Sequence, residues 1–183
     1  MTFILIAGIA GSGKSTVGKE LESRGYETHD TDNTGNAGWY RRDTGELVDY
    51  PETLEQIDSF YDQHEWVMPV ERVVELKNRS TSRIVFLCGM VANWRDLWEL
   101  FDYVICLTVD QNTLKHRLAH REEFRAFGRL PEELRRILSR HPSVDEEFRL
   151  SGATLIDSTQ PGDDVVDAVL TVVTSLPIER SLD

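Results

Sequence analysis

The chain has 183 residues, of which 40% are hydrophobic and 28% charged, and its 32 acidic side chains exceed its 20 lysines and arginines, for a net charge of −12. This length is that of one domain, residues 1–183, with a hydrophobic core large enough to exclude a dependence on disulfides or structural metals. The acidic balance argues against a nucleic-acid partner, because such binding needs a clustered positive surface.

Short apolar runs alternate along the chain with longer amphipathic segments, which is typical of a parallel sheet covered by helices on both faces. Five such runs predict strands at 3–7, 26–30, 83–88, 102–108 and 153–157. The first helix is expected to begin at 13–16 and to end at Gly25, and a last helix is expected at 163–175.

Residues 8–15 read GIAGSGKS and fit the phosphate-loop pattern GxxxxGK followed by Ser or Thr without a mismatch. The segment follows a predicted strand and opens a predicted helix, as the motif requires. Glycines let backbone N–H groups surround an anion, and the helix N-terminus adds partial positive charge. Lys14 would reach the β and γ phosphates of ATP, and Ser15 would bind Mg²⁺. The candidate nucleotide-binding residues here are Gly8, Ala10, Gly11, Ser12, Gly13, Lys14, Ser15 and Thr16.

The second predicted strand ends with two carboxylates, Asp30 and Asp32. On an extended segment, residues two apart point to the same side, and the carboxyl ends of parallel strands lie beside the phosphate loop. We expect Asp30 to contribute to the Mg²⁺ site and Asp32 to bind the acceptor of a phosphoryl group. The alternative is a solvated strand end.

Residues 33–80 carry no strand signal and are predicted to form a turn-rich loop followed by helices at 52–61 and 67–78. The segment 38–66 holds six of the sixteen aromatic residues, together with Arg41 and Arg42. It can be an acceptor pocket that stacks a planar group or the core of a small helical subdomain, and both interpretations stay open. Trp39 and Arg41 are the acceptor-binding candidates.

The third predicted strand ends in Cys88 and Gly89 rather than in the Asp of a Walker B strand, so a metal-side carboxylate must come from elsewhere, with Asp30 or Asp32 the nearest candidate. Gly89 would allow a ligand to approach the backbone. Asn93, with Asp96 three residues later, predicts the start of a helix. Gly89 and Asn93 are further acceptor-site candidates.

Asp110 is expected to cap a helix that carries Arg117, Arg121 and Arg125 on one face. From 115 to 141, seven arginines and one lysine stand against four glutamates, a local charge of +4 in a chain whose remainder carries −16. Arginine suits the charge of a transferred phosphoryl group, although a solvated helix with Arg–Glu pairs is the alternative. Further helices are predicted to begin at Pro131 and, after Pro142, at Ser143.

No run reaches the roughly 18 apolar residues of a membrane span, and the apolar start lacks the basic residues of a signal peptide. Cys88 and Cys106 lie in apolar runs and are expected to be buried, reduced thiols, without the spacing of a metal site. These features predict a cytoplasmic protein with no membrane partner.

Several segments of the chain resemble the nucleoside monophosphate kinase-like group of P-loop kinases, which includes shikimate, gluconate and adenylate kinases. The resemblance lies in GKSTVG at 13–18 followed by DTD at 30–32, in LxxRLxxR at 114–121 and in IDSTQP at 156–161. It implies an α/β, three-layer P-loop NTPase fold with a five-stranded parallel sheet of order 2-3-1-4-5, helices on both faces, an acceptor-binding region at 33–80 and a lid at 118–135. It also implies that Arg117 stacks on adenine, that Arg121 touches the transferring phosphates, and that Thr159 and Pro161 border the adenine.

The sequence thus predicts a kinase that moves the γ-phosphoryl of Mg·ATP to a small acceptor, with Lys14, Asp32 and Arg121 as catalytic residues. The acceptor would be a nucleoside, a nucleotide or a shikimate-like compound. Shikimate itself is disfavoured because Cys88-Gly89-Met90 replaces the three glycines of shikimate kinases. Two alternatives are an ATP-binding switch or sensor with slow ATPase activity and a kinase of a nucleic-acid end or a sugar nucleotide. The oligomeric state is open.

Overall fold

The computed structural model describes residues 1–33, 35–51, 57–120, 127–128 and 130–176. Eight strands and six α-helices are assigned in these residues. The strands are β1 (Thr2–Ala7), β2 (Glu27–Asp30), β3 (Gly38–Arg41), β4 (Leu47–Val48), β5 (His64–Val67), β6 (Ile84–Cys88), β7 (Tyr103–Thr108) and β8 (Thr154–Asp157). The helices are α1 (Lys14–Ser23), α2 (Ile57–Gln63), α3 (Val70–Arg79), α4 (Gln111–Ala119), α5 (Pro131–Leu150) and α6 (Gly162–Ser175).

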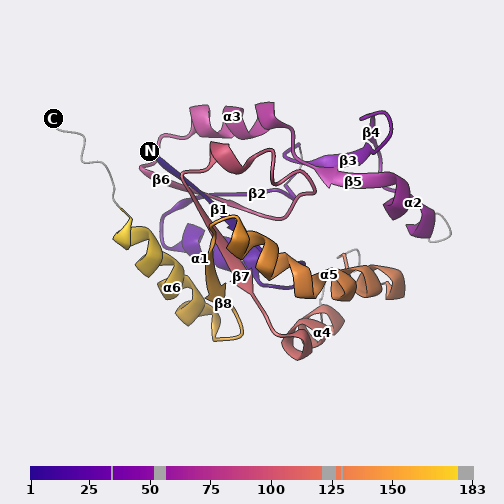
Figure 1. Ribbon diagram of the computed structural model, residues 1–183. Coiled ribbons are helices and arrows are strands. Elements are labelled where there is room, and N and C mark those ends of the chain that lie inside the picture. Colours follow the sequence, from indigo (N-terminus) through magenta and orange to yellow (C-terminus); the bar gives the residue numbers. More distant parts are fainter. Residues whose placement is uncertain (34, 52–56, 121–126, 129, 177–183) are drawn as a thin grey trace.

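The main sheet has five parallel strands in the order β2-β6-β1-β7-β8, shown in Figure 1. Numbered among themselves, these strands have the order 2-3-1-4-5, so the predicted α/β P-loop kinase fold and all five predicted strands are confirmed. In the register, Asp30 at the end of β2 stands beside Cys88 of β6, and Cys88 stands beside Ile6 of β1. The sheet thus brings the end of β2 within two strands of the loop that follows β1.

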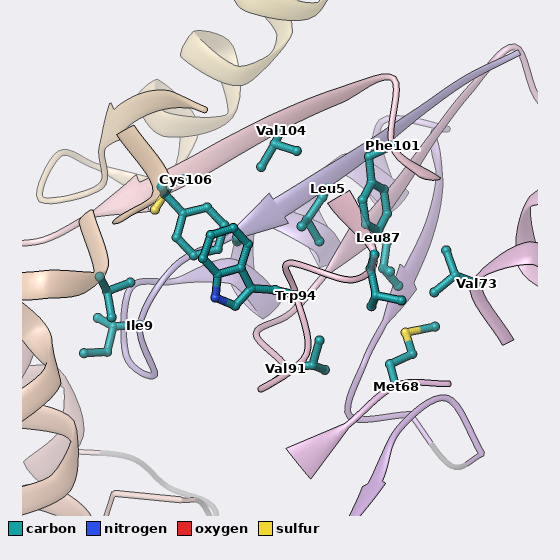
Figure 2. Packing of buried hydrophobic residues seen from close by; sticks show 14 of the residues in the cluster. Leu5, Ile9, Met68, Val73, Leu87, Val91, Trp94, Phe101, Val104 and Cys106 are labelled. Carbon is teal, nitrogen blue, oxygen red and sulfur yellow. The ribbon is translucent and has the colours of Figure 1, made fainter. Parts of the chain in front are cut away.

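Two apolar layers cover the two faces of this sheet because side chains alternate along each strand. Ile4 and Ile6 of β1 belong to the layer that includes residues of α1 and α6. Phe3 and Leu5 belong to the other layer, which includes residues of α3, α4 and α5 and part of which is drawn in Figure 2. Each β1 side chain from Phe3 to Ala7 is at most 5% exposed. The predicted placement of helices on both faces is therefore confirmed.

A second, antiparallel sheet of order β4-β3-β5 lies within the segment that was expected to contain no strands. That expectation was wrong because the strands are short and their residues are only half-buried, apart from the exposed Leu47. Helix α2 and this sheet share an aromatic cluster centred on Trp39, whose ring lies 5.2 Å from Phe60, 5.5 Å from Tyr61 and 5.4 Å from Trp66. We call β3, β4, β5 and α2 the side module; it extends from one end of the main sheet in Figure 1.

The helix expected to begin at Asn93 is absent: the described residues there form turns and a short 3₁₀ helix, Trp98–Leu100. The side chain of Asn93 accepts a hydrogen bond from the Met68 amide and donates one to the Met68 carbonyl, at 3.2 and 2.9 Å. It therefore links two distant segments instead of capping a helix.

Helix α5 runs without interruption through Pro142, so the expected restart at Ser143 was wrong. A proline inside a helix removes one hydrogen bond. In α5, buried residues on both sides of Pro142, Ile137 and Val144 among them, hold the helix against the sheet. The predicted starts at Asp110 and Pro131 are confirmed: the Asp110 carboxylate accepts from the amides of Asn112 and Thr113.

None of the described helices has the length and apolar character required to cross a membrane.

Candidate functional site

The loop between β1 and α1 wraps around the N-terminus of the helix. Gly13 has a left-handed conformation (φ 96°), and α1 begins at the next residue. The Lys14 ammonium donates a 2.9 Å hydrogen bond to the Ile9 carbonyl across the loop. Ser15 and Thr16 are exposed on the first turn of α1. The backbone thus presents a helix N-terminus and a lysine at one place, an arrangement that binds phosphate groups.

Three glycines of this loop have different physical roles. A Cβ at Gly8 would lie 2.6 Å from the Leu107 carbonyl oxygen, and a Cβ at Gly11 would lie 2.7 Å from the Leu114 side chain. These two glycines let the loop pack on β7 and α4. At Gly13 the nearest neighbour of a Cβ would be the Arg117 guanidinium at 3.7 Å, so this glycine serves the left-handed turn. The Ser12 hydroxyl is buried and has no hydrogen-bond partner among the described residues.

Arg117 of α4 connects this loop to the loop after β8. Its guanidinium donates to the Ser158 carbonyl at 2.6 Å, and the Ser158 hydroxyl donates to the Thr108 carbonyl at 2.7 Å. Ser158 is 3% exposed, so its contact with Arg117 is shielded from solvent. The Thr159 amide donates to Asp157, which lowers the pKa of that carboxyl, and Pro161 immediately precedes α6. Lys14, Arg117, Thr159 and Pro161 thus belong to three segments that meet at one end of the sheet.

Next to the phosphate loop, the first two turns of α1 and of α6 enclose an open cleft of about 280 Å³. Thr16, Val17, Lys19, Glu20, Gly162, Asp163 and Val166 line it. The cleft therefore borders the phosphate loop on the side of Thr16 and the loop after β8.

Asp30 and Asp32 lie in a turn at the carboxyl end of β2. The Asp32 amide donates to the Asp30 carboxylate at 2.9 Å, and the Thr31 hydroxyl donates to Asp32 at 3.3 Å. Both Asp30 and Lys14 influence the pKa of the Cys88 thiol. Burial raises its pKa to about 12, Asp30 adds to the rise, and Lys14 opposes it. The Asp30 carboxylate and the Lys14 ammonium thus both lie near enough to this buried thiol to affect its pKa, in opposite directions.

The oxygen donors near the loop fit Mg²⁺. Asp30, Asp32 and the Ser15 hydroxyl are hard ligands, and Mg²⁺ commonly takes one or two carboxylates and completes its shell with water and nucleotide phosphates. Within the residues that the structure describes, no group of three or more His, Cys, Asp and Glu side chains gathers into an all-protein metal cage. The donor set suits a magnesium ion that arrives with a nucleotide.

The remaining acceptor candidates have different surroundings. Trp39 packs in the aromatic cluster of the side module, and the Arg41 guanidinium pairs with Asp43 at 2.8 Å. At Gly89 an added Cβ would collide with the Thr31 side chain, which fills the space beside this glycine. Asn93 binds the Met68 backbone, and Arg121 lies outside the described residues. The structure therefore brings Gly89 next to the Asp30–Asp32 turn and places Trp39 and Arg41 in the side module.

Three residues beside this site were missed by the sequence analysis. Ser158 holds Arg117, whereas Asn36 and Arg72 lie behind the Asp30–Asp32 turn. Asn36 lies in a turn-rich segment where polar residues are ordinary, so its burial leaves no sequence signal. The partner of Asn36 is 36 positions away, a distance that no local pattern reveals.

Comparison with known proteins gives the family and the fold. A family model described as an AAA domain matches residues 4–138. No curated protein sequence matches the chain.

Several solved structures share the fold at low sequence identity. Shikimate kinase from Acinetobacter baumannii in complex with shikimate is 20% identical, with a TM-score of 0.62 over 96% of this chain and 94% of that chain. A deoxyadenosine kinase from M. mycoides is 15% identical, with a TM-score of 0.57 over 96% of this chain and 100% of that chain. A gluconokinase from Sinorhizobium meliloti is 18% identical, with a TM-score of 0.50 over 94% and 91% of the two chains.

Proposed function

The chain belongs to the AAA domain family, and we propose that it is an ATP-dependent kinase of a small molecule. It transfers the γ-phosphoryl group of Mg·ATP to a hydroxyl or phosphate oxygen of an acceptor. The bond from the γ-phosphorus to the β–γ bridging oxygen breaks, and a bond to the acceptor oxygen forms. ADP leaves, and the proton of an acceptor hydroxyl passes to Asp32 or to solvent.

One observation carries this proposal: at one end of the sheet the phosphate loop, Arg117 with the loop after β8, and the Asp30–Asp32 turn come together. The first two supply positive charge and a helix N-terminus for the phosphates of a donor. The third supplies carboxylates at the neighbouring strand end. Catalysis of phosphoryl transfer consists mainly of positioning and charge stabilisation, which such a set provides.

On the donor side, the backbone of residues 8–15 surrounds the β-phosphate, and Lys14 exchanges its bond to the Ile9 carbonyl for the β and γ phosphates. Thr16 contacts the α-phosphate. Arg117 and the loop with Thr159 and Pro161 enclose the adenine. Ser15 and Asp30 hold Mg²⁺, which neutralises charge on the phosphates when it is bound. Arg121 contributes charge from the lid at 118–135.

On the acceptor side, Asp32 binds the acceptor hydroxyl, and residues 33–80 supply the walls of its site. The relatives with this fold are kinases of shikimate, of gluconate and of a deoxynucleoside. The acceptor classes to consider for this chain are therefore polyhydroxy acids, nucleosides and nucleoside monophosphates. The aromatic rings of the side module pack on one another around Trp39, so they do not select among these classes.

The test is a screen for acceptor-dependent ADP release with Mg·ATP and, in turn, shikimate, gluconate, nucleosides and nucleoside monophosphates. One class is expected to raise ADP release well above the rate without acceptor. The Lys14→Ala variant is expected to lose at least about 100-fold of that rate, because a charge aimed at the transferred group is absent. Its circular dichroism should match the wild type.

The exposed Lys115 of α4 gives a matched control: Lys115→Ala removes a lysine without touching the phosphate loop and should retain the wild-type rate. A Lys14→Ala variant with wild-type turnover would contradict the proposed function. Intact ATP binding with failure of every small acceptor would instead favour the switch or sensor with slow ATPase activity.

A further inference from the structure

A buried amide lies directly behind the Asp30–Asp32 turn. Asn36 is 4% exposed, one of few polar residues so deeply buried among the described ones. Its side-chain nitrogen donates a 2.6 Å hydrogen bond to the Asp30 carbonyl. Its backbone amide donates to the Asn33 carbonyl, and the Asn33 amide donates to Asp30 as well. The Asp30 carbonyl oxygen thus accepts two hydrogen bonds, which fixes the peptide plane that follows Asp30.

The other end of the same amide is held from α3. The Asn36 side-chain oxygen accepts from the Arg72 guanidinium at 3.0 Å, and a second nitrogen of Arg72 donates to Glu75 at 2.7 Å. Arg72 is fixed at two points and buries most of its side chain, of which 26% is exposed. A chain of contacts therefore runs from Glu75 through Arg72 and Asn36 to the backbone of Asp30.

This series of contacts helps to orient the Asp30 and Asp32 side chains at the end of β2. Thr31 is held by its amide to the Cys88 carbonyl at 2.9 Å, and the Asp32 amide is held by the Asp30 carboxylate. The Cys88 carbonyl thus holds the amide end of the peptide after Asp30, and the Asn33 amide and the Asn36 side chain hold its carbonyl end. The Asn36 side chain also ties this peptide to α3 through Arg72. Without Asn36, the Asp30 carbonyl keeps the longer, 3.2 Å bond from Asn33 and loses the shorter one, so the turn is held less tightly.

We propose that Asn36 and Arg72 are positioning residues that aim Asp30 at the metal ion bound with the nucleotide. The inference rests on the proposed function, since it assumes that Asp30 takes part in the magnesium site. Residues that orient a metal ligand from behind commonly change metal affinity by 10-fold to 100-fold when they are replaced.

The experiment measures ATP binding by calorimetry twice for each variant, once with EDTA and once with saturating Mg²⁺. The dissociation constant measured with EDTA, divided by that measured with Mg²⁺, gives the contribution of the metal to ATP binding. Asn36→Ala and Arg72→Gln are expected to reduce this ratio by roughly 10-fold while leaving the affinity for metal-free ATP within about twofold. Arg72→Lys should restore part of the ratio, because a lysine can still donate one hydrogen bond to Asn36.

Two comparisons separate positioning from a general loss of structure. Arg79→Ala is the matched control, because Arg79 bonds to the same Glu75 on the same helix but is 73% exposed; its ratio should equal that of the wild type. Asp30→Asn should abolish the metal contribution. If Asn36→Ala unfolds, the Mg²⁺ contribution measured for Arg72→Gln, which lies on the surface side of the contact, tests the positioning role instead.

The outcomes distinguish this inference from the proposed function. A wild-type ratio above one that persists in Asn36→Ala and Arg72→Gln would overturn the positioning role and leave the kinase proposal intact. A wild-type protein that binds ATP equally with and without Mg²⁺ would overturn the positioning role, and one that binds no ATP would overturn both.

Discussion

Asp145 of α5 is a carboxyl group whose surroundings oppose its charge. One of its carboxylate oxygens is buried and has no hydrogen-bond partner among the described residues. Burial raises the pKa of Asp145 above its ordinary value of 3.8, while His141, one turn earlier, opposes the shift. The folded state therefore keeps the proton to a higher pH than the unfolded chain does. It follows that the free energy of unfolding falls as pH rises through this pKa.

We predict that Asp145→Asn stabilises the protein at pH 7 by about 1 kcal/mol, because a neutral amide avoids the cost of burying the carboxylate charge. The gain should shrink as pH falls toward the ordinary pKa of aspartate, where the wild-type carboxyl is neutral too. Urea unfolding at pH 7 and near pH 4 measures both. Glu146→Gln is the control: Glu146 is paired with Arg149, which lowers the pKa of Glu146, so its loss should not stabilise the protein. A less stable Asp145→Asn variant at pH 7 would show that the carboxylate has a favourable partner.

Single residues also mark where sequence reasoning stops. The phosphate loop could be read from eight adjacent positions, because local backbone geometry alone demands glycines and a lysine there. The roles of Asn93 and Asn36 could not be predicted, since Asn93 binds a residue 25 positions away and Asn36 binds one 36 positions away. An asparagine before a polar turn has the same local signature whether it caps a helix or joins two segments.

At the scale of elements, the start of α5 is held by Glu133, which is 4% exposed. Its carboxylate accepts the amides of Gly128 and Leu130, at 2.8 and 3.2 Å, as helix-start carboxylates commonly do. The same carboxylate accepts the hydroxyl of Tyr61 from α2 at 2.6 Å and that of Tyr50 at 3.2 Å. One buried side chain thus joins the side module to α5.

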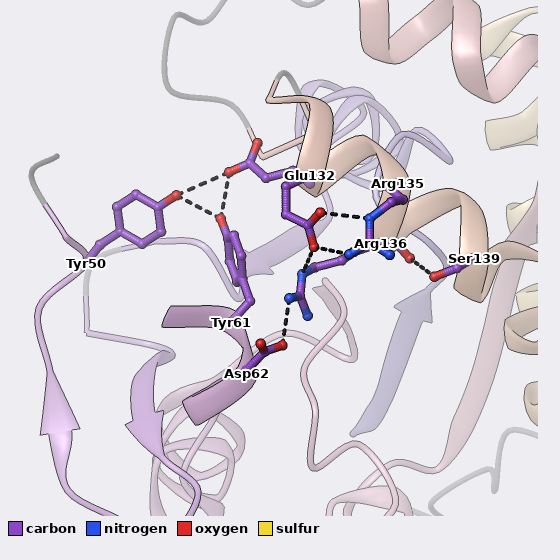
Figure 3. Close-up of polar contacts among 8 residues, drawn as sticks. Tyr50, Tyr61, Asp62, Glu132, Arg135, Arg136 and Ser139 are labelled. Atoms are coloured by element: carbon purple, nitrogen blue, oxygen red, sulfur yellow. Dashed lines mark hydrogen bonds and ion pairs between the residues drawn. The ribbon is translucent and has the colours of Figure 1, made fainter. Parts of the chain in front are cut away.

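Ion pairs lie beside this contact, as Figure 3 shows: Arg136 of α5 pairs with Asp62 at 2.7 Å and with Glu132 at 2.7 Å. The Arg136 guanidinium also lies over the Tyr61 ring, 5.5 Å from its centre. Burial, followed by the hydrogen bond to Glu133, raises the pKa of Tyr61 well above that of an ordinary tyrosine. Tyr61 is therefore a permanent donor to Glu133 at physiological pH.

We predict that Tyr61→Phe lowers the free energy of unfolding by about 2 kcal/mol, because a buried carboxylate loses its shortest side-chain donor. Tyr50→Phe should cost less than about 1 kcal/mol, since the Tyr50 hydroxyl is more distant from Glu133 and Tyr50 is 40% exposed. Both values come from urea unfolding followed by circular dichroism. A Tyr50→Phe loss equal to or larger than that of Tyr61→Phe would contradict this ranking.

The elements also differ in how well the sequence predicts them. The five parallel strands could be found because strands covered on both faces are continuous apolar runs, as at β1 and β7. The strands of the side module could not, because β3 (GWYR) and β5 (HEWV) are only four residues long and mix aromatic with charged residues instead of forming an apolar run. The uninterrupted α5 was missed because Pro142 normally ends a helix, whereas packing of the residues around it maintains this one.

For the whole molecule, the main sheet and the side module differ in burial. β1, β6 and β7 are almost wholly buried between two layers of helices, whereas the described strands of the side module are at best half-buried. Regions with less buried apolar surface open at a lower free energy than the core does. The side module should therefore open without the main sheet.

We predict that, in native-state hydrogen exchange, the paired amides of β3 and β5 exchange at least about 10-fold faster than those of β1 and β7, equivalent to about 1.4 kcal/mol. Mass spectrometry of peptides from each strand measures this. The edge strand β8 of the main sheet is the internal comparison, because it lies at the edge of its sheet as β5 does, while its Ile156 packs in the core. Equal protection in the two sheets would mean that the molecule unfolds as one unit.

The distribution of tryptophans has an optical consequence. The structure describes all four tryptophans: the rings of Trp39 and Trp66 lie 5.4 Å apart in the side module, tilted by 58°, and those of Trp94 and Trp98 lie 5.6 Å apart beside Phe148 of α5. Intrinsic fluorescence is therefore a sum of two separate signals, one from each part of the molecule. Replacing Trp94 and Trp98 with phenylalanine leaves an emission that reports on the side module alone, with no attached dye.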